Sequence, residues 1–372
     1  MWSVQGVRSP VKREGAEQYI FISLISFAAS VVLTRLFLQI TGYPQLGGGN
    51  LHIAHVIWGG LLLFIASLLP LILANRWAFN TSAVLSGVGV GLFIDEVGKF
   101  ITQTNDYFYP PAAPIIYAFF LLTVLLYLQV RRPPDKNPRG ELYRILEGLT
   151  EVLDHDLDPV EREALEARLL QTASASDDRN LQHLAKALAS YLKTEQLFLV
   201  KPRTRRIHLV EKRFNQFFQV HVTRSRLKAI LIFALGSMGV LALIEFSLLL
   251  WAIPAPQPAI ESIIGPLVTR GELRSAGDAL WFLVRIILEG GTGFLLVIAG
   301  GMLVVGQERR GIRIATLVLI VWLTVINLLM FYFDQFGAVM AALFQFLVLL
   351  ALAYYRRRYL ADTHPKEPPA SV

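Results

Sequence analysis

Long runs of apolar residues dominate the chain and alternate with short polar breaks. A helix needs about 20 apolar residues to cross the hydrocarbon core of a membrane, and eight stretches meet this requirement. No run alternates apolar and polar residues over the length that a barrel strand needs. The pattern therefore predicts an all-α, polytopic membrane protein with eight transmembrane helices. We expect these helices at residues 19–40, 52–74, 82–101, 112–130, 229–251, 279–305, 314–333 and 338–355.

Basic residues gather on one side of the predicted membrane, which indicates the orientation of the helices. The loops on the other side, 41–51, 102–111 and 334–337, contain no Lys or Arg, and only the long loop 252–278 departs from the pattern. Cytoplasmic loops carry an excess of Lys and Arg, so we expect a cell-membrane protein with both termini in the cytoplasm. The first helix is too long for the core of a signal peptide and is interpreted as an uncleaved anchor. The basic side includes Arg13, Arg76, Arg131, Arg309 and Arg356.

Charge is concentrated between the fourth and fifth helices. Residues 131–228 hold 19 of the 35 Lys and Arg and 14 of the 28 Asp and Glu in the chain of 372 residues. The remainder has too few charged side chains to coat a soluble surface. The chain is therefore divided into a cytoplasmic N-terminal segment (1–18), transmembrane helices 1–4 (19–130), a cytoplasmic helical insert (131–228), transmembrane helices 5–8 (229–355) and a cytoplasmic tail (356–372).

The insert itself shows helical patterns and a basic end. We expect a helix over 141–158, a second one from Asp158 to Leu170 and a third over 180–192. The second begins with Asp158, Pro159 and Glu161, the N-cap, N1 and N3 residues typical of a capped helix start.

Residues 201–228 contain nine Lys and Arg against the single acid Glu211, with Phe214, Phe217 and Phe218 on one helical face. This pattern predicts an amphipathic helix on the anionic inner leaflet of the lipid bilayer. Nucleic acid is not expected as a partner, since no groove-reading motif is present. A cytoplasmic protein partner could bind the insert, and the pattern gives no oligomeric state.

The two hydrophobic halves share an order of features. Tyr107 and Tyr332 each lie in an aromatic and acidic cluster, and an arginine follows each after 24 residues, at Arg131 and Arg356. A parallel 4+4 repeat, related by an axis along the membrane normal, would explain this order. The alternative is that aromatic residues at the outer boundary and arginines at the inner one recur in unrelated membrane proteins.

Ionisable residues within the predicted helices lie toward their outer ends. A charge near the membrane centre costs at least about 2.5–3.5 kcal/mol, so it usually marks a function or a charge pair. The inner halves, such as 82–94 and 290–305, contain no charged residue. The sequence therefore predicts a polar cavity that is open to the outside and closed below. Its candidate binding residues are Arg35, Asp95, Glu96, Lys99, Glu245, Arg285, Glu289 and Asn327.

Simpler interpretations exist for some of these residues. Asp95 and Lys99 are four residues apart, as are Arg285 and Glu289, so each pair could form an ion pair within one helix. A glycine pattern at 87, 89 and 91 lies inside an apolar stretch and is better interpreted as helix packing than as a phosphate loop.

His52 and His55 are three residues apart on one helical face, a spacing that allows two nitrogen ligands to one metal ion. A divalent metal site with Asp95 or Glu96 is therefore a candidate cofactor site, whereas interfacial histidines facing lipid headgroups are the alternative. The chain has no cysteine, which excludes disulfides and thiolate ligands.

Three function classes remain. A transporter of a small solute or ion is favoured by the buried charges and the glycine-rich helices. A membrane sensor or assembly protein would signal through the 131–228 insert. A membrane-embedded, metal-dependent hydrolase or transferase would act on a lipid or envelope substrate.

Overall fold

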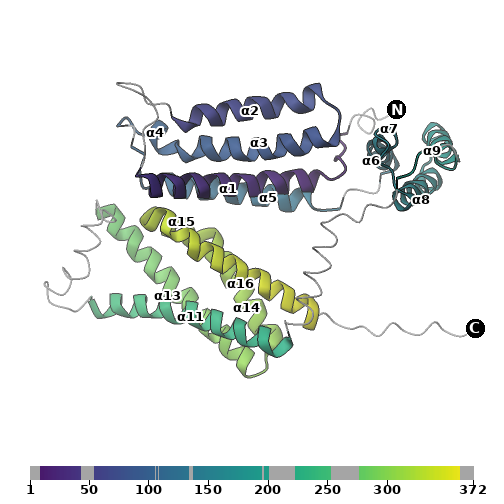
Figure 1. The fold of residues 1–372 in the computed structure, drawn as a ribbon. Coiled ribbons are helices and arrows are strands. Elements are labelled where there is room, and N and C mark those ends of the chain that lie inside the picture. Colours follow the sequence, from purple (N-terminus) through teal and green to yellow (C-terminus); the bar gives the residue numbers. More distant parts are fainter. Residues whose placement is uncertain are drawn as a thin grey trace, which may run out of the picture. The chain divides into compact units, whose positions relative to one another are not determined.

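The computed structural model describes residues 9–42, 54–104, 106–107, 109–133, 137–194, 197–200, 223–252 and 276–360. Within these ranges the secondary structure is entirely helical, as Figure 1 shows. Eight helices are long and apolar enough to cross a membrane. The chain is therefore an all-α, multi-pass integral membrane protein, which confirms this part of the sequence prediction.

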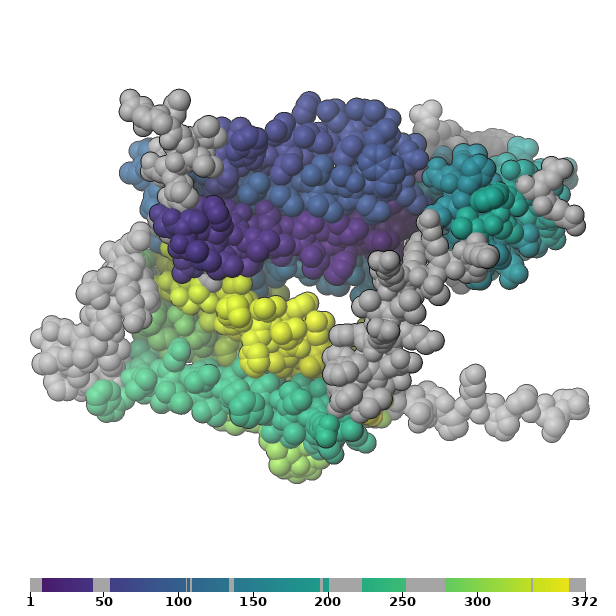
Figure 2. All heavy atoms as spheres, in the orientation of Figure 1, coloured from purple at the N-terminus to yellow at the C-terminus, as the bar shows by residue number. Residues whose placement is uncertain are grey.

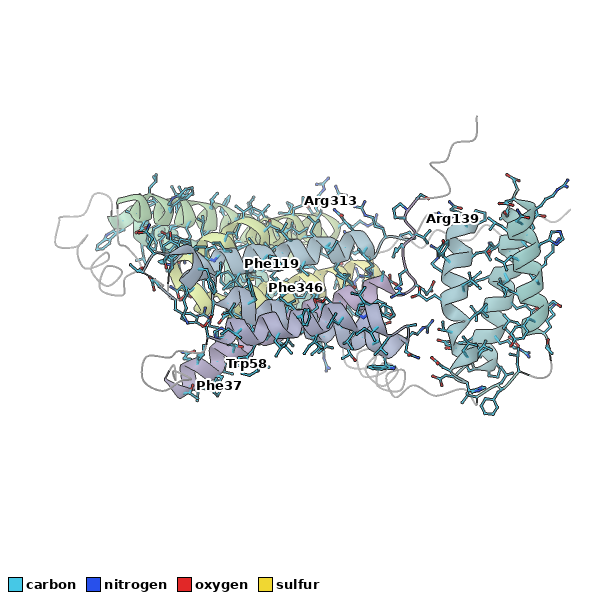
Figure 3. All side chains as sticks on the ribbon, turned by 90° about the horizontal axis from the view of Figure 1, so that it is seen from above. Phe37, Trp58, Phe119, Arg139, Arg313 and Phe346 are labelled. Atoms are coloured by element: carbon cyan, nitrogen blue, oxygen red, sulfur yellow. The ribbon has the colours of Figure 1, made fainter. Side chains whose placement is uncertain are left out.

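Each of the eight predicted stretches overlaps an observed helix, but the third, predicted over 82–101, corresponds to a helix over Arg76–Asp95 and a separate short helix over Val97–Ile101. The seventh is continuous but contains a π-helical segment, Trp322–Ile326, between α14 and α15. Large apolar side chains such as Phe37, Trp58 and Phe346 remain exposed on these helices (Figure 3), as expected for surfaces that face lipid. The helices are α1 (Ala16–Thr41), α2 (His55–Ile72), α3 (Arg76–Asp95), α5 (Ala112–Val130), α11 (Arg224–Ala252), α13 (Ala276–Val304), α14 (Glu308–Val321) with α15 (Asn327–Asp334), and α16 (Ala338–Tyr359).

The chain forms two compact units. Unit 1 comprises Met1–Glu96 and Leu122–Arg213, and unit 2 comprises Val97–Leu121 and Phe214–Val372. Helix α5 contributes residues to both. The two units are described separately below.

In unit 1, α3 lies between α1 and α2 and packs against both (Figure 1). Glycines allow this close approach: a Cβ atom on Gly89 would lie 2.9 Å from the carbonyl oxygen of Gly59 in α2. On the other side of α3, a Cβ atom on Gly91 would lie 2.6 Å from the Cβ atom of Ser30 in α1, and Gly87 is equally close to α1. The predicted packing role of these glycines is confirmed.

Unit 1 also contains a helical module, residues 137–200, which forms the teal group of atoms beyond the end of α1 and α3 in Figure 2. Its helices are α6 (Pro138–Gly148), α7 (Thr150–Leu153), α8 (Pro159–Ala175) and α9 (Arg179–Leu192). They enclose an apolar core of their own. The core includes Leu142, Ile145, Leu157, Leu165, Leu169 and Leu192.

The start of α8 agrees with the sequence prediction. The backbone N–H of Glu161 donates to the Asp158 carboxylate over 2.8 Å, and the backbone N–H of Asp158 donates to the Glu161 carboxylate over 3.2 Å. These two bonds form the predicted capping box. The preceding helix differs from the prediction, because it is interrupted at Leu149 and ends at Leu153, followed by His155 in a left-handed conformation.

Unit 2 contains the short helix α4 (Val97–Ile101) and the helices α11, α13, α14, α15 and α16. Helices α11 and α13 approach closely at Gly239 and Gly293, where a Cβ atom on Gly239 would lie 2.6 Å from the Gly293 carbonyl oxygen. The last two spans are joined by a single 3₁₀ turn, Gln335–Gly337.

The predicted 4+4 repeat is not confirmed. The central packing helix of unit 1 is α3, the third span, whereas in unit 2 α13, the sixth span, packs against both α11 and α14. A parallel repeat would pair α3 with the seventh span instead, so the duplication stays a prediction. The amphipathic basic helix was predicted over 201–228. Its residues 201–222 lie outside the described residues, as does most of the loop 252–278, and its last residues belong to α11.

Candidate functional site

Four ionisable residues meet where α1, α2 and α3 end or begin, and we call them the Arg35 cluster: Arg35, His55, Asp95 and Glu96. Arg35 comes from α1, His55 is the first residue of α2, Asp95 is the last residue of α3 and Glu96 follows it. Asp95 and Glu96 are 0% and 1% exposed, and Arg35 is 7% exposed. Charges this deeply buried must be paired.

Arg35 makes two contacts with Asp95. Its Nε donates to the Asp95 carboxylate over 2.5 Å, and its terminal nitrogen donates to the Asp95 backbone carbonyl over 3.0 Å. A helix leaves its last carbonyl groups without intrahelical partners, and a cation at that end interacts favourably with the helix dipole. Arg35 therefore neutralises Asp95 and stabilises the end of α3 at the same time.

His55 bridges the two carboxylates of the cluster. Its Nε2 lies 3.1 Å from Asp95 Oδ2 and its Nδ1 lies 3.1 Å from Glu96 Oε1. Carboxylates accept hydrogen bonds, and a histidine ring donates from both nitrogens only when it is protonated. In that state two cations face two anions, which lowers the cost of burying the cluster.

The predicted metal site depends on His52 and His55. A histidine binds a metal ion through a ring nitrogen that carries no proton, but both nitrogens of His55 face carboxylate oxygens here. In the described part of the chain, no group of three or more His, Asp and Glu residues is arranged to hold a metal ion. His52 lies outside that part, so a metal site with Asp95 or Glu96 stays a prediction.

The other predicted cavity residues belong to unit 2. Arg285 Nε donates to Glu289 over 2.8 Å, within α13 and at the four-residue spacing noted in the sequence. Glu245 of α11 lies 3.7 Å from Arg285, and its side chain is 54% exposed, whereas Glu289 is 3% exposed. Lys99 of α4 lies over the ring of Tyr107, with 5.1 Å from Nζ to the ring centroid.

Asn327 belongs to a separate buried polar group of unit 2. Its Nδ2 donates to Gln345 of α16 over 2.8 Å and lies 3.4 Å from the hydroxyl of Tyr117 in α5. The Tyr117 hydroxyl donates to the Leu323 carbonyl over 2.7 Å, inside the π-helical segment. Asn327 Oδ1 and Trp322 Nε1 are buried, and neither has a hydrogen-bond partner among the described residues.

The predicted cavity residues therefore fall into two sets. Unit 1 holds Arg35, Asp95 and Glu96, and unit 2 holds Lys99, Glu245, Arg285, Glu289 and Asn327. A single cavity that they all line stays a prediction. Sequence reasoning missed Tyr117, Gln345 and Trp322, since an aromatic or amide residue in an apolar span gives no signal of its partner.

At the opposite end of α1 and α3, unit 1 contains a set of ion pairs that we call the docking contacts. Arg13 Nε lies 2.5 Å from Glu147 Oε1, and the backbone N–H of Glu14 donates to the same carboxylate over 3.0 Å. Arg76, the first residue of α3, pairs with Glu151 of α7. The segment before α1 and the start of α3 are thus both held by the module.

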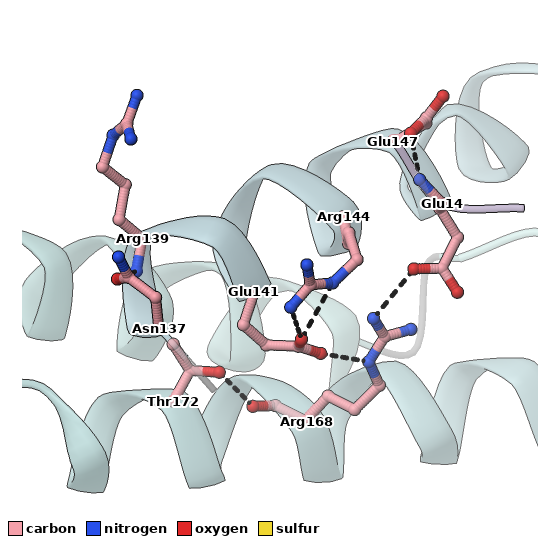
Figure 4. A network of polar contacts seen from close by, with 8 residues as sticks. All are labelled: Glu14, Asn137, Arg139, Glu141, Arg144, Glu147, Arg168 and Thr172. Carbon is pink, nitrogen blue, oxygen red and sulfur yellow. Dashed lines mark hydrogen bonds and ion pairs between the residues drawn. The ribbon is translucent and has the colours of Figure 1, made fainter. Parts of the chain in front are cut away.

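A second layer of the docking contacts centres on Arg168 of α8 (Figure 4). Its guanidinium lies 2.6 Å from Glu141 and 3.2 Å from Glu14, and Arg144 donates to Glu141 over 2.6 Å. Burial raises the pKa of Glu141, but the hydrogen bonds and positive charges of Arg144 and Arg168 outweigh it and lower the pKa below its usual range. Sequence reasoning missed this network, because its members are up to 154 residues apart.

The Arg35 cluster and the docking contacts are separated by about one membrane thickness. Helix α1 has 26 residues and α3 has 20, so at 1.5 Å per residue they are about 39 Å and 30 Å long. The hydrocarbon core of a bilayer is about 30 Å thick. Two membrane-spanning helices therefore connect a buried ionic cluster at one end with a helical module at the other.

Function is inferred from this geometry alone. Comparison with models of known protein families, with characterised proteins and with solved structures finds no match for the chain.

Proposed function

We propose that the protein is a membrane sensor, in which a change at the Arg35 cluster alters how the helical module docks on the other side of the bilayer. The observation that carries this proposal is that α1 and α3 each contribute to the Arg35 cluster, while the segment just before α1 and the first residue of α3 contact the module at the opposite end. The orientation expected from the basic residues puts the cluster outside and the module in the cytoplasm.

The packing of α1 against α3 supports transmission along the helices. Gly87 and Gly91 bring the two backbones together, and the Ser30 hydroxyl donates to the Val88 carbonyl over 3.1 Å. Helices packed without free space shift as rigid bodies rather than deform. A displacement of the end of α3 relative to α1 at Asp95 would therefore reach Arg76.

The docking contacts are suited to respond to such a displacement. Arg76 and Arg13 are partly exposed, with 41% of each side chain accessible. Ion pairs at such positions contribute about 0–1 kcal/mol each. A small shift could thus release the module without unfolding the membrane helices.

The test measures backbone hydrogen exchange of the full chain in lipid nanodiscs. Asp95→Asn removes the charge that Arg35 and His55 share, and we expect several-fold faster exchange in α6, α7 and α8. Glu289→Gln is the matched control, since it removes a buried, arginine-paired carboxylate from unit 2, and it should leave the module unchanged. Circular dichroism of each purified variant reports whether it is folded.

Coupling between two sites must be reciprocal. Glu147→Gln, which removes the partner of Arg13, should therefore alter exchange in the first turn of α2 and the last turn of α3. The sensor proposal is wrong if folded Asp95→Asn leaves the module unchanged and folded Glu147→Gln leaves the helix ends unchanged.

A transporter is the second candidate, and the polar group around Asn327 favours it. Transporters bind substrates and ions where a membrane helix is irregular, and here a π-helix precedes a buried Asn327 whose Oδ1 has no partner among the described residues. Proteoliposomes under H⁺, Na⁺ or K⁺ gradients would reveal charge movement. Its loss in Asn327→Leu and Glu289→Gln, with retention in Asp95→Asn, would support transport over sensing.

The metal-dependent hydrolase or transferase expected from His52 and His55 stays a prediction. Metal analysis of the purified protein tests it directly. A stoichiometric metal that is lost in the variant His52→Ala/His55→Ala would support the enzyme over both other candidates.

A further inference from the structure

A hollow opens in unit 2 at the turn between α13 and α14. Its volume is about 490 Å³, and it is lined by the turn Gly306–Glu308, by Arg309 and Arg310 of α14, by Arg224 of α11 and by Leu360. Gly306 has a φ of +90°, which glycine adopts without strain, and a Cβ atom there would meet none of the described atoms within 4 Å.

Positive charge predominates in this hollow. Among the described residues that line it, three carry guanidinium groups and one, Glu308, carries a carboxylate. That carboxylate is already engaged, since it accepts from Arg224 and Lys228 over 2.9 Å each and from the Tyr355 hydroxyl over 2.8 Å. Glu308 therefore holds Arg224 at the hollow, where arginines outnumber carboxylates among the described lining residues.

The side chains around the hollow change from apolar to basic within a few residues. Val304 and Val305, at the end of α13, are 64% and 76% exposed. Arg309 and Arg310 follow after one turn, and both are exposed. This change from an exposed apolar surface to exposed arginines is typical of the boundary between the acyl chains and the headgroups of a bilayer.

We propose that this hollow binds a phosphate-bearing group, supplied by the headgroup of an anionic lipid. The planar guanidinium of arginine matches the geometry of phosphate oxygens and forms paired, charge-assisted hydrogen bonds with them. The adjacent valines provide a surface for the acyl chains, which a soluble phosphate would not use. The site is confined to unit 2 and is independent of the proposed sensor function.

Native mass spectrometry of the full chain in detergent tests this proposal, with phosphatidylglycerol as the anionic probe and phosphatidylcholine as the zwitterionic one. The variant Arg309→Gln/Arg310→Gln should bind phosphatidylglycerol about thirtyfold more weakly, the effect of two interfacial cations. The control variant Arg313→Gln/Arg357→Gln removes two exposed arginines that do not line the hollow, and its affinity should change less than threefold. Binding of phosphatidylcholine should be equal in all three proteins.

Two results would overturn the proposal. Equal phosphatidylglycerol binding by both double variants would show that these arginines act only as scattered surface charges. Displacement of the lipid by millimolar inorganic phosphate would show that a soluble phosphate, rather than a lipid, is the ligand. Unchanged hydrogen exchange in α14 serves as the check that each variant is folded.

Discussion

Asp95 is a buried carboxylate that connects residues of three helices. Its carboxylate accepts a hydrogen bond from Nε of Arg35 in α1 and lies within hydrogen-bond distance of His55 in α2. Its backbone carbonyl accepts a second hydrogen bond from Arg35. Removing one partner from a buried ion pair leaves an uncompensated charge and costs about 3–5 kcal/mol, whereas replacing both partners with apolar residues costs much less. Comparing single and double substitutions in the cluster therefore tests whether its residues stabilise the protein as pairs.

We expect Asp95→Leu to destabilise the protein by about 3–5 kcal/mol, because Arg35 is then buried without its carboxylate. The double variant Arg35→Leu/Asp95→Leu should recover more than half of this loss. Chemical unfolding in detergent micelles, followed by circular dichroism, measures both. If the double variant loses as much as the sum of the two single variants, the two residues do not act as a pair.

The sequence located Arg35, Asp95 and Glu96 but not their partners. A spacing of four residues made Lys99 an equally good candidate partner for Asp95. In the structure α3 ends at Asp95 and α4 begins at Val97, so the helical spacing does not continue across this point. The partner of Asp95 is Arg35, which is 60 residues away, and no local pattern reveals such a distance.

Two adjacent glycines in α2, Gly59 and Gly60, differ in how closely they approach a neighbouring helix. In α2, Gly59 faces the backbone of α3, where an added Cβ atom would lie 2.8 Å from the Gly89 carbonyl oxygen. In the described part of the chain, no atom lies within 4 Å of a Cβ atom built on Gly60. The GxxxG type of packing in membranes requires this close backbone approach. Gly59 and Gly60 therefore form a matched pair for testing it.

We expect Gly59→Ala to destabilise unit 1 by about 1–3 kcal/mol, since the added methyl group forces α2 away from α3. Gly60→Ala should be neutral or slightly stabilising, because alanine is the better helix former. Thermal unfolding of the two variants in nanodiscs would compare them directly. Equal effects at both positions would contradict the close packing of α2 and α3 at Gly59.

In the helical module, Asp158→Ala removes the N-cap of α8 and its bond to the Glu161 N–H. Loss of such a cap typically costs about 0.5–2 kcal/mol, so exchange in the first turn of α8 should accelerate. Asp177→Ala, at an exposed acid before the next helix, is the control. A first turn that is equally protected in both variants would mean that the capping box does not stabilise α8.

Long apolar runs predicted all eight spans, because a helix that crosses the lipid hydrocarbon needs a run of apolar residues of a set length, and such a run is visible in the sequence. The capping box could also be predicted from the sequence, since its residues are near neighbours in the chain. The π-helix at Trp322–Ile326 was not predicted, because its residues would suit an α-helix equally well. Its position is set by tertiary contacts such as the bond from Tyr117 to the Leu323 carbonyl.

At the scale of the molecule, the compact units defined by contacts do not follow the division of the chain into membrane and hydrophilic segments. Hydropathy separates the module from the first membrane helices, yet unit 1 contains both. Ion pairs connect them, and these pairs involve groups that titrate. The stability of the docking contacts therefore depends on pH through Glu141.

Because the pKa of Glu141 is lowered in the folded state, its contribution is present above the pKa of the unfolded chain and is lost as pH falls through the folded pKa. We expect exchange in α6 and α8 to accelerate as pH falls through this range, after correction for the intrinsic rate. Glu141→Gln should weaken this dependence. An unchanged pH profile in that variant would assign the acid sensitivity to other groups.

The docking contacts also impose an order on biosynthesis. The backbone of Glu14 binds Glu147, a residue that is synthesised 133 positions later. At about 5–20 residues per second, the ribosome needs on the order of ten seconds to make this stretch. All four membrane helices of the first half are therefore synthesised before the hydrogen bond between Glu14 and Glu147 can form. Closure of the Glu14–Glu147 bond is thus a late step in assembly, and it cannot form until the nascent chain has passed its fourth span.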